Sequence, residues 1–180
     1  GWTDSDFEYL ELQNIGTTPI NMTDVRFTKG IDFDFSPETI IDPGAFLLIV
    51  KNQAAFASRY GAGLPIAGEW DLNDKLSNGG ENIKLSLGSG TAIIEFAYDD
   101  NTPWPTSSDG GGSSLTLILP TETLPADHSN PLAWQASQQP GGTPGVAGPD
   151  TSNFELWAQS IGLGAEASMT SDNDNDGMNN

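Results

Sequence analysis

The sequence Ile83-Lys84-Leu85-Ser86-Leu87 alternates apolar and polar side chains, and Gly88-Ser89-Gly90 separates it from a second apolar run at residues 92–98. Successive side chains of a β-strand point to opposite faces of a sheet, so this alternation indicates a strand with one buried and one wet face. The glycine-rich triplet favours a tight turn. The segment therefore predicts an antiparallel hairpin, with its apolar side chains in the core and Lys84 and Ser86 in solvent.

Short apolar runs of this kind recur along the chain, and the 21 glycines and 12 prolines lie between them as turn signals. This rhythm is typical of an all-β domain. At residues 31–35 apolar and acidic side chains alternate, which places Asp32 and Asp34 on a solvent face where they protect an edge. Further strands are predicted at residues 9–13, 21–28, 46–51 and 114–119.

Helical patterns are rare in the sequence. Residues 54–60 predict about two turns of helix, with Asn52 as the amino-terminal cap and Gly61 as the stop. A second short helix is predicted at 153–161, where apolar residues recur at helical spacing. Six of the prolines fall in residues 120–152, which we expect to be loops. We place a domain boundary at Gly148, with residues 1–148 as the β domain and 149–180 as a linker.

The net charge excludes several classes of partner. Six Lys and Arg residues stand against 25 Asp and Glu residues, which gives −19 at neutral pH. Such a chain repels phosphate backbones and anionic lipid head groups, so we expect neither nucleic-acid binding nor membrane docking. Nor is there an 18-residue apolar run to insert into a membrane. Hydrophobic residues make up 36% of the chain, enough for one core.

The charges are unevenly distributed. All six basic residues precede Leu85, whereas residues 85–180 hold 12 acids and no Lys or Arg. The acids of the second half therefore have no cation of their own, and solvation or a divalent metal is needed to balance them. The chain has no cysteine, which excludes disulfides, thiolate metal sites and cysteine nucleophiles.

The order of the segments resembles the bacterial lamin-tail domain, an immunoglobulin-like β-sandwich. The resemblance covers about residues 7–145 and rests on ten short matches in one order, none of them decisive alone. They lie at residues 9–14 with 20–22, 25–27, 31–35, 41–44 with 46–52, 55–61, 76–81, 98–100, 104–105, 109–115 and 141–145.

The resemblance implies a non-catalytic structural or interaction module of a large exported or cell-surface bacterial protein, whose signal peptide lies outside this fragment. Domains of this kind usually open with a strand that this sequence lacks before Gly1. A neighbouring strand edge would then be free, and we expect edge-strand self-association there.

The strongest chemical motif is Asp172-Asn173-Asp174-Asn175-Asp176-Gly177-Met178-Asn179-Asn180. Oxygen side chains at alternate positions with glycine at the sixth match the spacing of a calcium loop. Asp172, Asp174, Asp176, the Met178 carbonyl and Asn180 would be the ligands. The motif resembles the repeats of dockerins and thrombospondin type 3 modules. The acid expected at the twelfth position would follow Asn180, so we expect weak calcium binding here; a disordered acidic terminus is the alternative.

Catalysis finds little support in the sequence. The lone His128 is expected to be a solvated loop side chain. Carboxylate pairs such as Glu8 with Glu11, or Asp99 with Asp100, fit a hydrolase only loosely. A carbohydrate-binding module is the main alternative to the interaction module, with Trp70, Trp104 or Trp134 stacking on sugar rings, although packing is the commoner role for Trp104. The partner of the interaction module would be a protein or polysaccharide surface.

Overall fold

The computed structural model describes residues 1–147, and the chain divides after Gly148 into two units, of which the first is described below. Eleven strands and one α-helix make up the described part of the chain. The elements are β1 (Tyr9–Gln13), β2 (Ile20–Asn21), β3 (Val25–Lys29), β4 (Phe33–Asp34), β5 (Ile40–Ile41), β6 (Phe46–Val50), α1 (Gln53–Tyr60), β7 (Ile66–Glu69), β8 (Glu81–Leu87), β9 (Thr91–Tyr98), β10 (Ser113–Leu117) and β11 (Trp134–Pro140). The fold is β-rich, as the sequence predicted.

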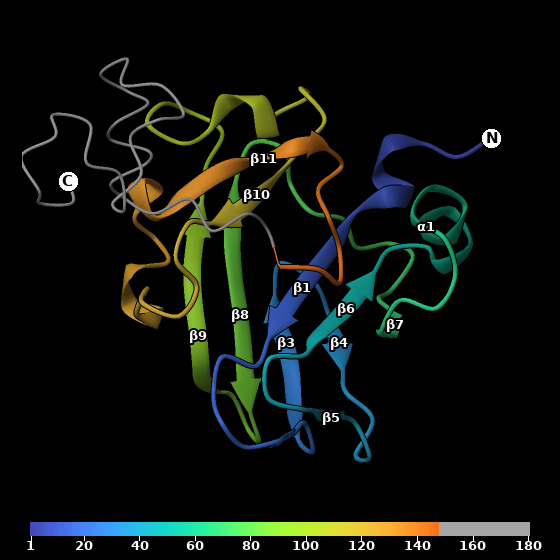
Figure 1. The fold of residues 1–180 in the computed structure, drawn as a ribbon, viewed down its shortest axis with the longest axis vertical. Helices are drawn as coiled ribbons and strands as arrows, with labels where there is room; N and C mark the ends of the chain where they lie inside the picture. The colour runs from blue at the N-terminus through green and yellow to red at the C-terminus, as the bar shows by residue number, and fades with distance from the viewer. Residues whose placement is uncertain (148–180) are drawn as a thin grey trace, which may run out of the picture. The chain divides into compact units, whose positions relative to one another are not determined.

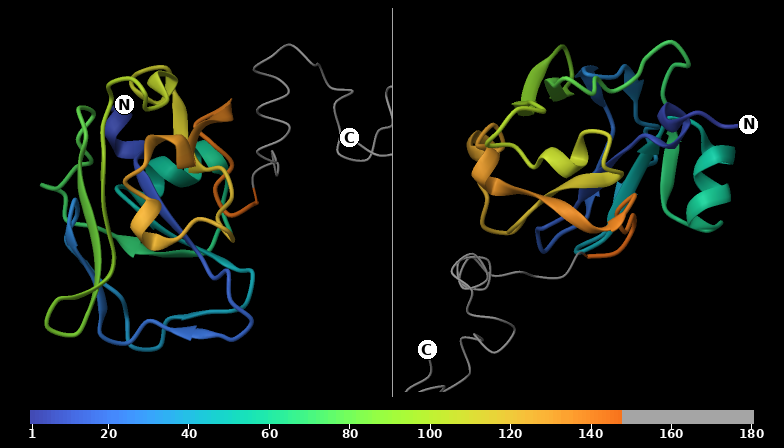
Figure 2. Two further views of the ribbon diagram at one scale, coloured as in Figure 1. Left: turned by 90° about the vertical axis from the view of Figure 1, so that its left-hand side faces the viewer. Right: turned by 90° about the horizontal axis from the view of Figure 1, so that it is seen from above.

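Two sheets make up most of the domain. A four-stranded antiparallel sheet has the order β4-β3-β8-β9, and a three-stranded sheet has the order β1-β6-β7. Strands β1 and β6 cross over β3 and β4 in Figure 1, and Figure 2 gives the view from the side and from above. Two-stranded ribbons, β2-β5 and β10-β11, complete the pairing.

Both sheets contribute to one hydrophobic core. Phe27 and Leu85 from the four-stranded sheet are directly opposite in register, and Leu47 and Ile49 from β6 belong to the same buried cluster. Trp70 is also part of it, with 2% of its surface exposed. Burial of such side chains contributes about 1.5–3 kcal/mol each, which makes this core the main source of stability.

Helix α1 follows the prediction closely. The Asn52 side chain accepts the Ala55 N–H at 3.0 Å, and Gly61 ends the helix with φ of 87°. Phe56 packs on Leu48 and Val50 on the side of β6 that faces away from the main core. The helix therefore covers the second face of the three-stranded sheet, beside β6 and β7 (Figure 1).

Strand β7 lay outside the predictions. It pairs in parallel with β6, and α1 lies in the connection between the two strands. Parallel neighbours need a long crossover, which a helix commonly supplies. The sequence of β7, Ile66-Ala67-Gly68-Glu69, has no clear alternation, so only the tertiary pairing identifies it.

The predicted β8–β9 hairpin is confirmed, but two of its side chains were placed wrongly. Ser86 has no exposed surface, because its hydroxyl pairs with that of Thr28 at 2.9 Å and it lies between Arg26 and Ala92 on the flanking strands. Leu87, at the end of β8, is 48% exposed.

The loop expected at 120–152 contains strand β11, which is a further correction. Pro140 is the last residue of this strand, opposite Ser113, and β11 pairs on one side only, with β10. Proline is tolerated at such an edge because no ladder hydrogen bond depends on its missing N–H. The predicted second helix at 153–161 lies outside the described residues.

Hydroxyl groups hold the end of this segment against the three-stranded sheet. The Tyr9 and Tyr60 hydroxyls donate to the Gly141 carbonyl at 3.0 and 2.9 Å, and Ser114 donates to the same oxygen at 2.9 Å. Burial raises the pKa of Tyr9 to about 12. The tyrosine therefore stays protonated and keeps donating throughout the physiological pH range.

The Asn14 side chain joins the loop after β1 to strand β5. Its side chain is 1% exposed, its amide donates to the Thr18 and Ile41 carbonyls at 2.9 and 2.8 Å, and its oxygen accepts the Gly16 N–H at 2.9 Å. Three of the four hydrogen-bonding positions of this side-chain amide are thus used. A buried polar side chain with these partners stabilises the turn after β1.

We predict that Asn14→Ala lowers the free energy of unfolding by about 2–3 kcal/mol, because buried backbone groups lose their partners. Chemical denaturation measures the loss. Asn21→Ala is the matched control, since its side chain caps the exposed Thr23 at 2.8 Å, and it should cost less than about 1 kcal/mol. Equal losses in the two variants would contradict the role given to Asn14.

Candidate functional site

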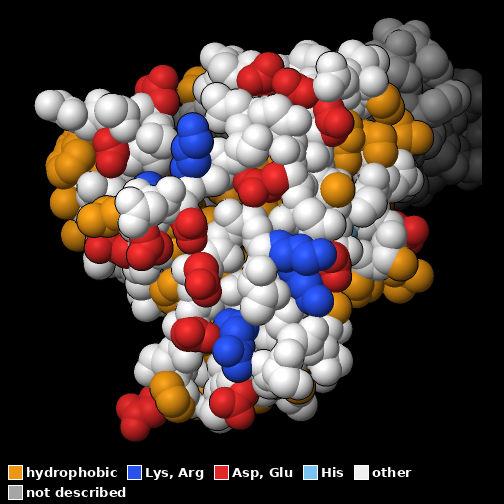
Figure 3. Space-filling view, turned by 180° about the vertical axis from the view of Figure 1, so that it is seen from behind, with side chains coloured by type: hydrophobic (Ala, Val, Ile, Leu, Met, Phe, Trp, Pro, Cys, Tyr) orange, Lys and Arg blue, Asp and Glu red, His pale blue; other side chains and the backbone are white. Residues whose placement is uncertain are grey.

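The face of the four-stranded sheet that points away from the core carries charged side chains, and we call it the outer face. Strand register places Asp34, Arg26 and Ser86 in one row and Lys29, Lys84 and Glu95 in another. Lys and Arg side chains gather among carboxylates on this side of the molecule (Figure 3). Half of the basic residues of a very acidic chain are therefore on one surface.

The Glu95 carboxylate pairs with two of these cations, Lys29 and Lys84. Glu95 accepts a hydrogen bond from the Lys29 ammonium at 2.5 Å and pairs with Lys84 at 3.6 Å. The hydrogen bond from Lys29, followed by the charges of both lysines, lowers the pKa of Glu95. Because the group is solvent-exposed, the interaction adds little stability, and its main effect is to position the charges.

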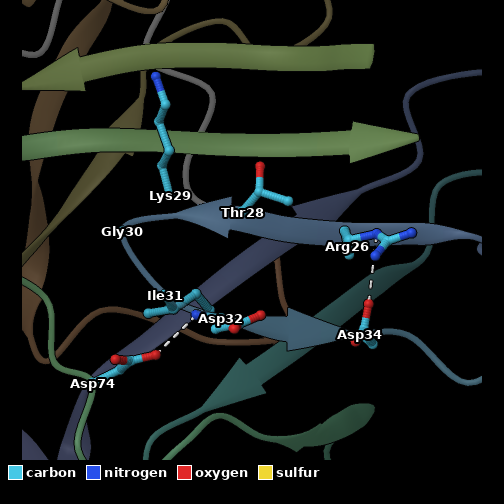
Figure 4. A pocket seen from close by; sticks show the side chains of 8 residues that line it. All are labelled: Arg26, Thr28, Lys29, Gly30, Ile31, Asp32, Asp34 and Asp74. Atoms are coloured by element: carbon cyan, nitrogen blue, oxygen red, sulfur yellow. Dashed lines mark hydrogen bonds and ion pairs between the residues drawn. The ribbon is translucent and has the colours of Figure 1, made fainter. Parts of the chain in front are cut away.

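A groove of about 570 Å³ opens on the outer face at the turn between β3 and β4 (Figure 4). Its walls come from β3, β4 and the loop after β7. The lining consists of Arg26, Thr28, Lys29, Gly30, Ile31, Asp32, Asp34 and Asp74.

Arg26 marks one end of the groove. Its Nε lies 3.7 Å from the Asp34 carboxylate, too far for a hydrogen bond, and both side chains are partly exposed. This Nε is nevertheless buried and has no hydrogen-bond partner among the described residues, a state it shares only with the Ser108 hydroxyl. Because this nitrogen is buried, the 39% of the Arg26 side chain that is exposed lies at its other atoms.

Asp32 and Asp74 mark the other end. The Asp74 carboxylate accepts the Asp32 N–H at 3.0 Å, which ties the loop after β7 to the start of β4 (Figure 4). The loop is held from beneath by Lys51, which is 7% exposed and donates to the Asp71, Leu72 and Asp74 carbonyls. Trp70 Nε1 also donates to the Asp74 carbonyl, at 3.2 Å. A buried cation therefore fixes the acidic wall of the groove.

We predict that Lys51→Met lowers the free energy of unfolding by about 2–4 kcal/mol, because three carbonyls lose a charged donor. Amide hydrogen exchange of Asn73 and Asp74 should also accelerate. Lys75→Met is the control: Lys75 is exposed in the next loop position, and its loss should change stability by less than about 0.5 kcal/mol. Unchanged exchange at residues 73–74 in Lys51→Met would contradict the anchoring role.

The tryptophans expected to stack on sugars are mostly inside the protein. Trp70 and Trp104 are 2% and 8% exposed, because the first belongs to the main core and the second packs at 6.3 Å from the Trp134 ring. Trp134 is half-buried, stacks on Phe96 at 5.4 Å and donates to the His128 carbonyl at 2.7 Å. Trp70 and Trp104 therefore offer no open ring to a sugar, and one face of Trp134 is occupied.

His128 was expected in solvent and is instead buried, at 8% exposure. Its ring meets Phe96 edge-on at 5.6 Å and Trp134 at 6.1 Å. Burial lowers its pKa, and the charge of Asp127 opposes this shift only partly. The side chain acts as part of an aromatic cluster at the end of β9.

This burial predicts a pH effect on stability. The folded pKa of His128 lies below the ordinary 6.5, so the unfolded chain binds the proton more readily and stability falls as pH drops below that value. Urea unfolding at about pH 7.5 and about pH 5.5 measures the fall. His128→Phe preserves the aromatic packing and should show a smaller decrease; an identical decrease would assign the effect to other groups.

Three of the four carboxylates considered for hydrolysis hold backbone groups. Glu8 accepts the Leu76 N–H at 2.9 Å and Glu11 the Gly145 N–H at 2.6 Å. Asp99 accepts the Asn101 N–H at 2.8 Å. Burial raises the pKa of Glu8, while its hydrogen bond from Leu76 opposes the shift.

No metal site is visible within the described range. Residues 1–147 contain no group of three or more His, Asp or Glu side chains placed to hold a metal ion. The predicted calcium ligands Asp172, Asp174, Asp176, Met178 and Asn180 lie outside the described residues, so calcium binding stays a prediction.

The groove was not foreseen from the sequence. Arg26, Lys29, Asp32 and Asp34 stand close together in the chain, and the polar positions of 25–29 and 31–35 were the available signal. Asp74 comes from a distant loop, which only the fold brings to the groove.

Comparisons with known proteins add no relative. No protein-family model, no curated protein and no solved structure matches the chain. Among the described helices, none is long and apolar enough to cross a membrane.

Proposed function

We propose that this chain is a non-catalytic interaction module of a larger exported or cell-surface bacterial protein, and that its fold is an immunoglobulin-like sandwich of the lamin-tail kind. The two sheets with a shared core support the fold. The resemblance of the segment order supports the cellular setting. The outer face of the four-stranded sheet is the surface that would meet a partner.

One observation carries this proposal. Some polar side chains of the domain anchor loops, and others are exposed on the outer face. Asn14, Lys51, Glu8 and Tyr9 are committed to holding backbone groups of loops, so these groups are not available for chemistry. The charged side chains of the outer face are exposed in part or in full, and among the described residues none of them holds a loop backbone. Such an arrangement suits recognition on a rigid scaffold.

The remaining parts of the proposal concern calcium and self-association. A weak calcium loop at Asp172–Asn180 would link the module to the segment that follows. A second copy would pair with β9, whose outer edge faces no other strand in the described sheet. The Ala97 N–H donates to the Ser129 hydroxyl at 3.2 Å, so the free part of this edge is its beginning, around the exposed Ile93.

The experiment measures co-sedimentation of the purified chain with isolated bacterial cell envelopes. We expect retention to fall about tenfold when Arg26→Glu and Lys84→Glu are combined, because repulsion then replaces attraction on the outer face. Arg59→Glu with Lys75→Glu makes the same charge change elsewhere and should leave retention unaltered. Equal retention of both double variants, or no retention of the unaltered chain, would reject the proposal.

A further inference from the structure

We propose that the groove on the outer face binds an extended peptide segment that carries an acidic side chain close to a basic one. This inference rests on the proposed interaction function and names the ligand of the same surface. At one end of the groove Arg26 forms an ion pair with Asp34, and at the other end lie two carboxylates, Asp32 and Asp74 (Figure 4). A ligand with both charges matches both ends.

The acidic side chain of the ligand is assigned to Arg26. Arg26 forms an ion pair with Asp34, whose carboxylate lies 3.7 Å from Nε, and 39% of the Arg26 side chain remains exposed. A carboxylate accepts two parallel hydrogen bonds from a guanidinium. An incoming carboxylate would therefore bind the exposed part of Arg26 and compete there with Asp34 for its charge.

The basic side chain of the ligand is assigned to Asp32 and Asp74. Asp74 uses one carboxylate oxygen to accept the Asp32 N–H, whereas its other oxygen and the Asp32 carboxylate receive no hydrogen bond within residues 1–147. Lys51 fixes the Asp74 backbone from beneath, so this end is preorganised. The net charge of −19 further favours a cationic group at this position.

An extended peptide fits these demands better than the other ligand classes. Alternate side chains of an extended strand point the same way about 7 Å apart, so one strand can direct two side chains into the groove. A ligand with balanced charge escapes the repulsion that the acidic chain exerts on a polyanion. The lining contains no aromatic ring, which sugar stacking would use.

The test is a titration of the ¹⁵N-labelled full chain with short blocked peptides, followed by NMR. The probes are acetyl-Glu-Thr-Lys-Thr-amide, its isomer with Glu and Lys exchanged, and the neutral acetyl-Gln-Thr-Gln-Thr-amide. We expect a charged peptide to shift the amides of Thr28, Gly30 and Asp32 at millimolar concentration, with an affinity that falls as salt is added. Shifts located elsewhere, or equal binding of the neutral peptide, would overturn the proposal.

Variants separate the two ends of the groove. Arg26→Met and Asp32→Asn should each weaken binding about tenfold, because each removes one charged partner. Arg59→Met and Glu38→Gln make the same changes at exposed positions outside the lining and should bind as the unaltered chain does. Arg26→Glu should regain affinity for a peptide in which Lys replaces Glu. Unchanged binding by Arg26→Met would overturn the assignment.

The peptide titration and the envelope co-sedimentation together distinguish failure of the peptide proposal from failure of the proposed interaction function. Envelope retention that depends on Arg26 and Lys84, without peptide binding, would reject this ligand class and leave the interaction function standing. Absence of both envelope retention and peptide binding would reject both proposals.

Discussion

The pairing register of β3 with β8 is the constraint on which the rest of the domain depends. Phe27 stands opposite Leu85, which points both side chains into the core shared with β6. The same register turns Arg26, Lys84 and Ser86 to the outer face. A slip by one residue would exchange the two sets, because strand side chains alternate with a period of two. Hydrophobic burial therefore fixes the position of the charges as well.

The domain has many loops and no cysteine, so noncovalent contacts must hold its loops in place. Here buried polar side chains take the place of covalent links. Asn14 joins the turn after β1, Lys51 gathers three carbonyls of the loop after β7, and three hydroxyls meet the Gly141 carbonyl. These contacts join segments far apart in the chain. They also make the acidic wall of the groove rigid, which links the packing beneath the surface to recognition above it.

Local patterns predicted much of the fold. β1 was predicted with its true limits, and the cap and stop of α1 were both correct, because each depends on neighbouring residues alone. Ser86 and His128 were misplaced because their burial depends on what lies across the sheet or at its end. Likewise, the sequence patterns of β7 and β11 are weak, and only pairing with β6 and β10 identifies these strands. The groove needed Asp74 beside Asp32, a contact between residues 42 positions apart.

Local patterns and composition were enough to predict a β-rich chain with one capped helix, an acidic character and few cations. These properties follow from periodicity, turn chemistry and composition, which act over a few residues. Packing between distant segments buries Trp70 and Trp104, directs Lys51 to the carbonyls of the loop after β7, and brings Asp74 beside Asp32 at the groove. Exposure and juxtaposition depend on which distant segments pack together, and no local pattern records that choice.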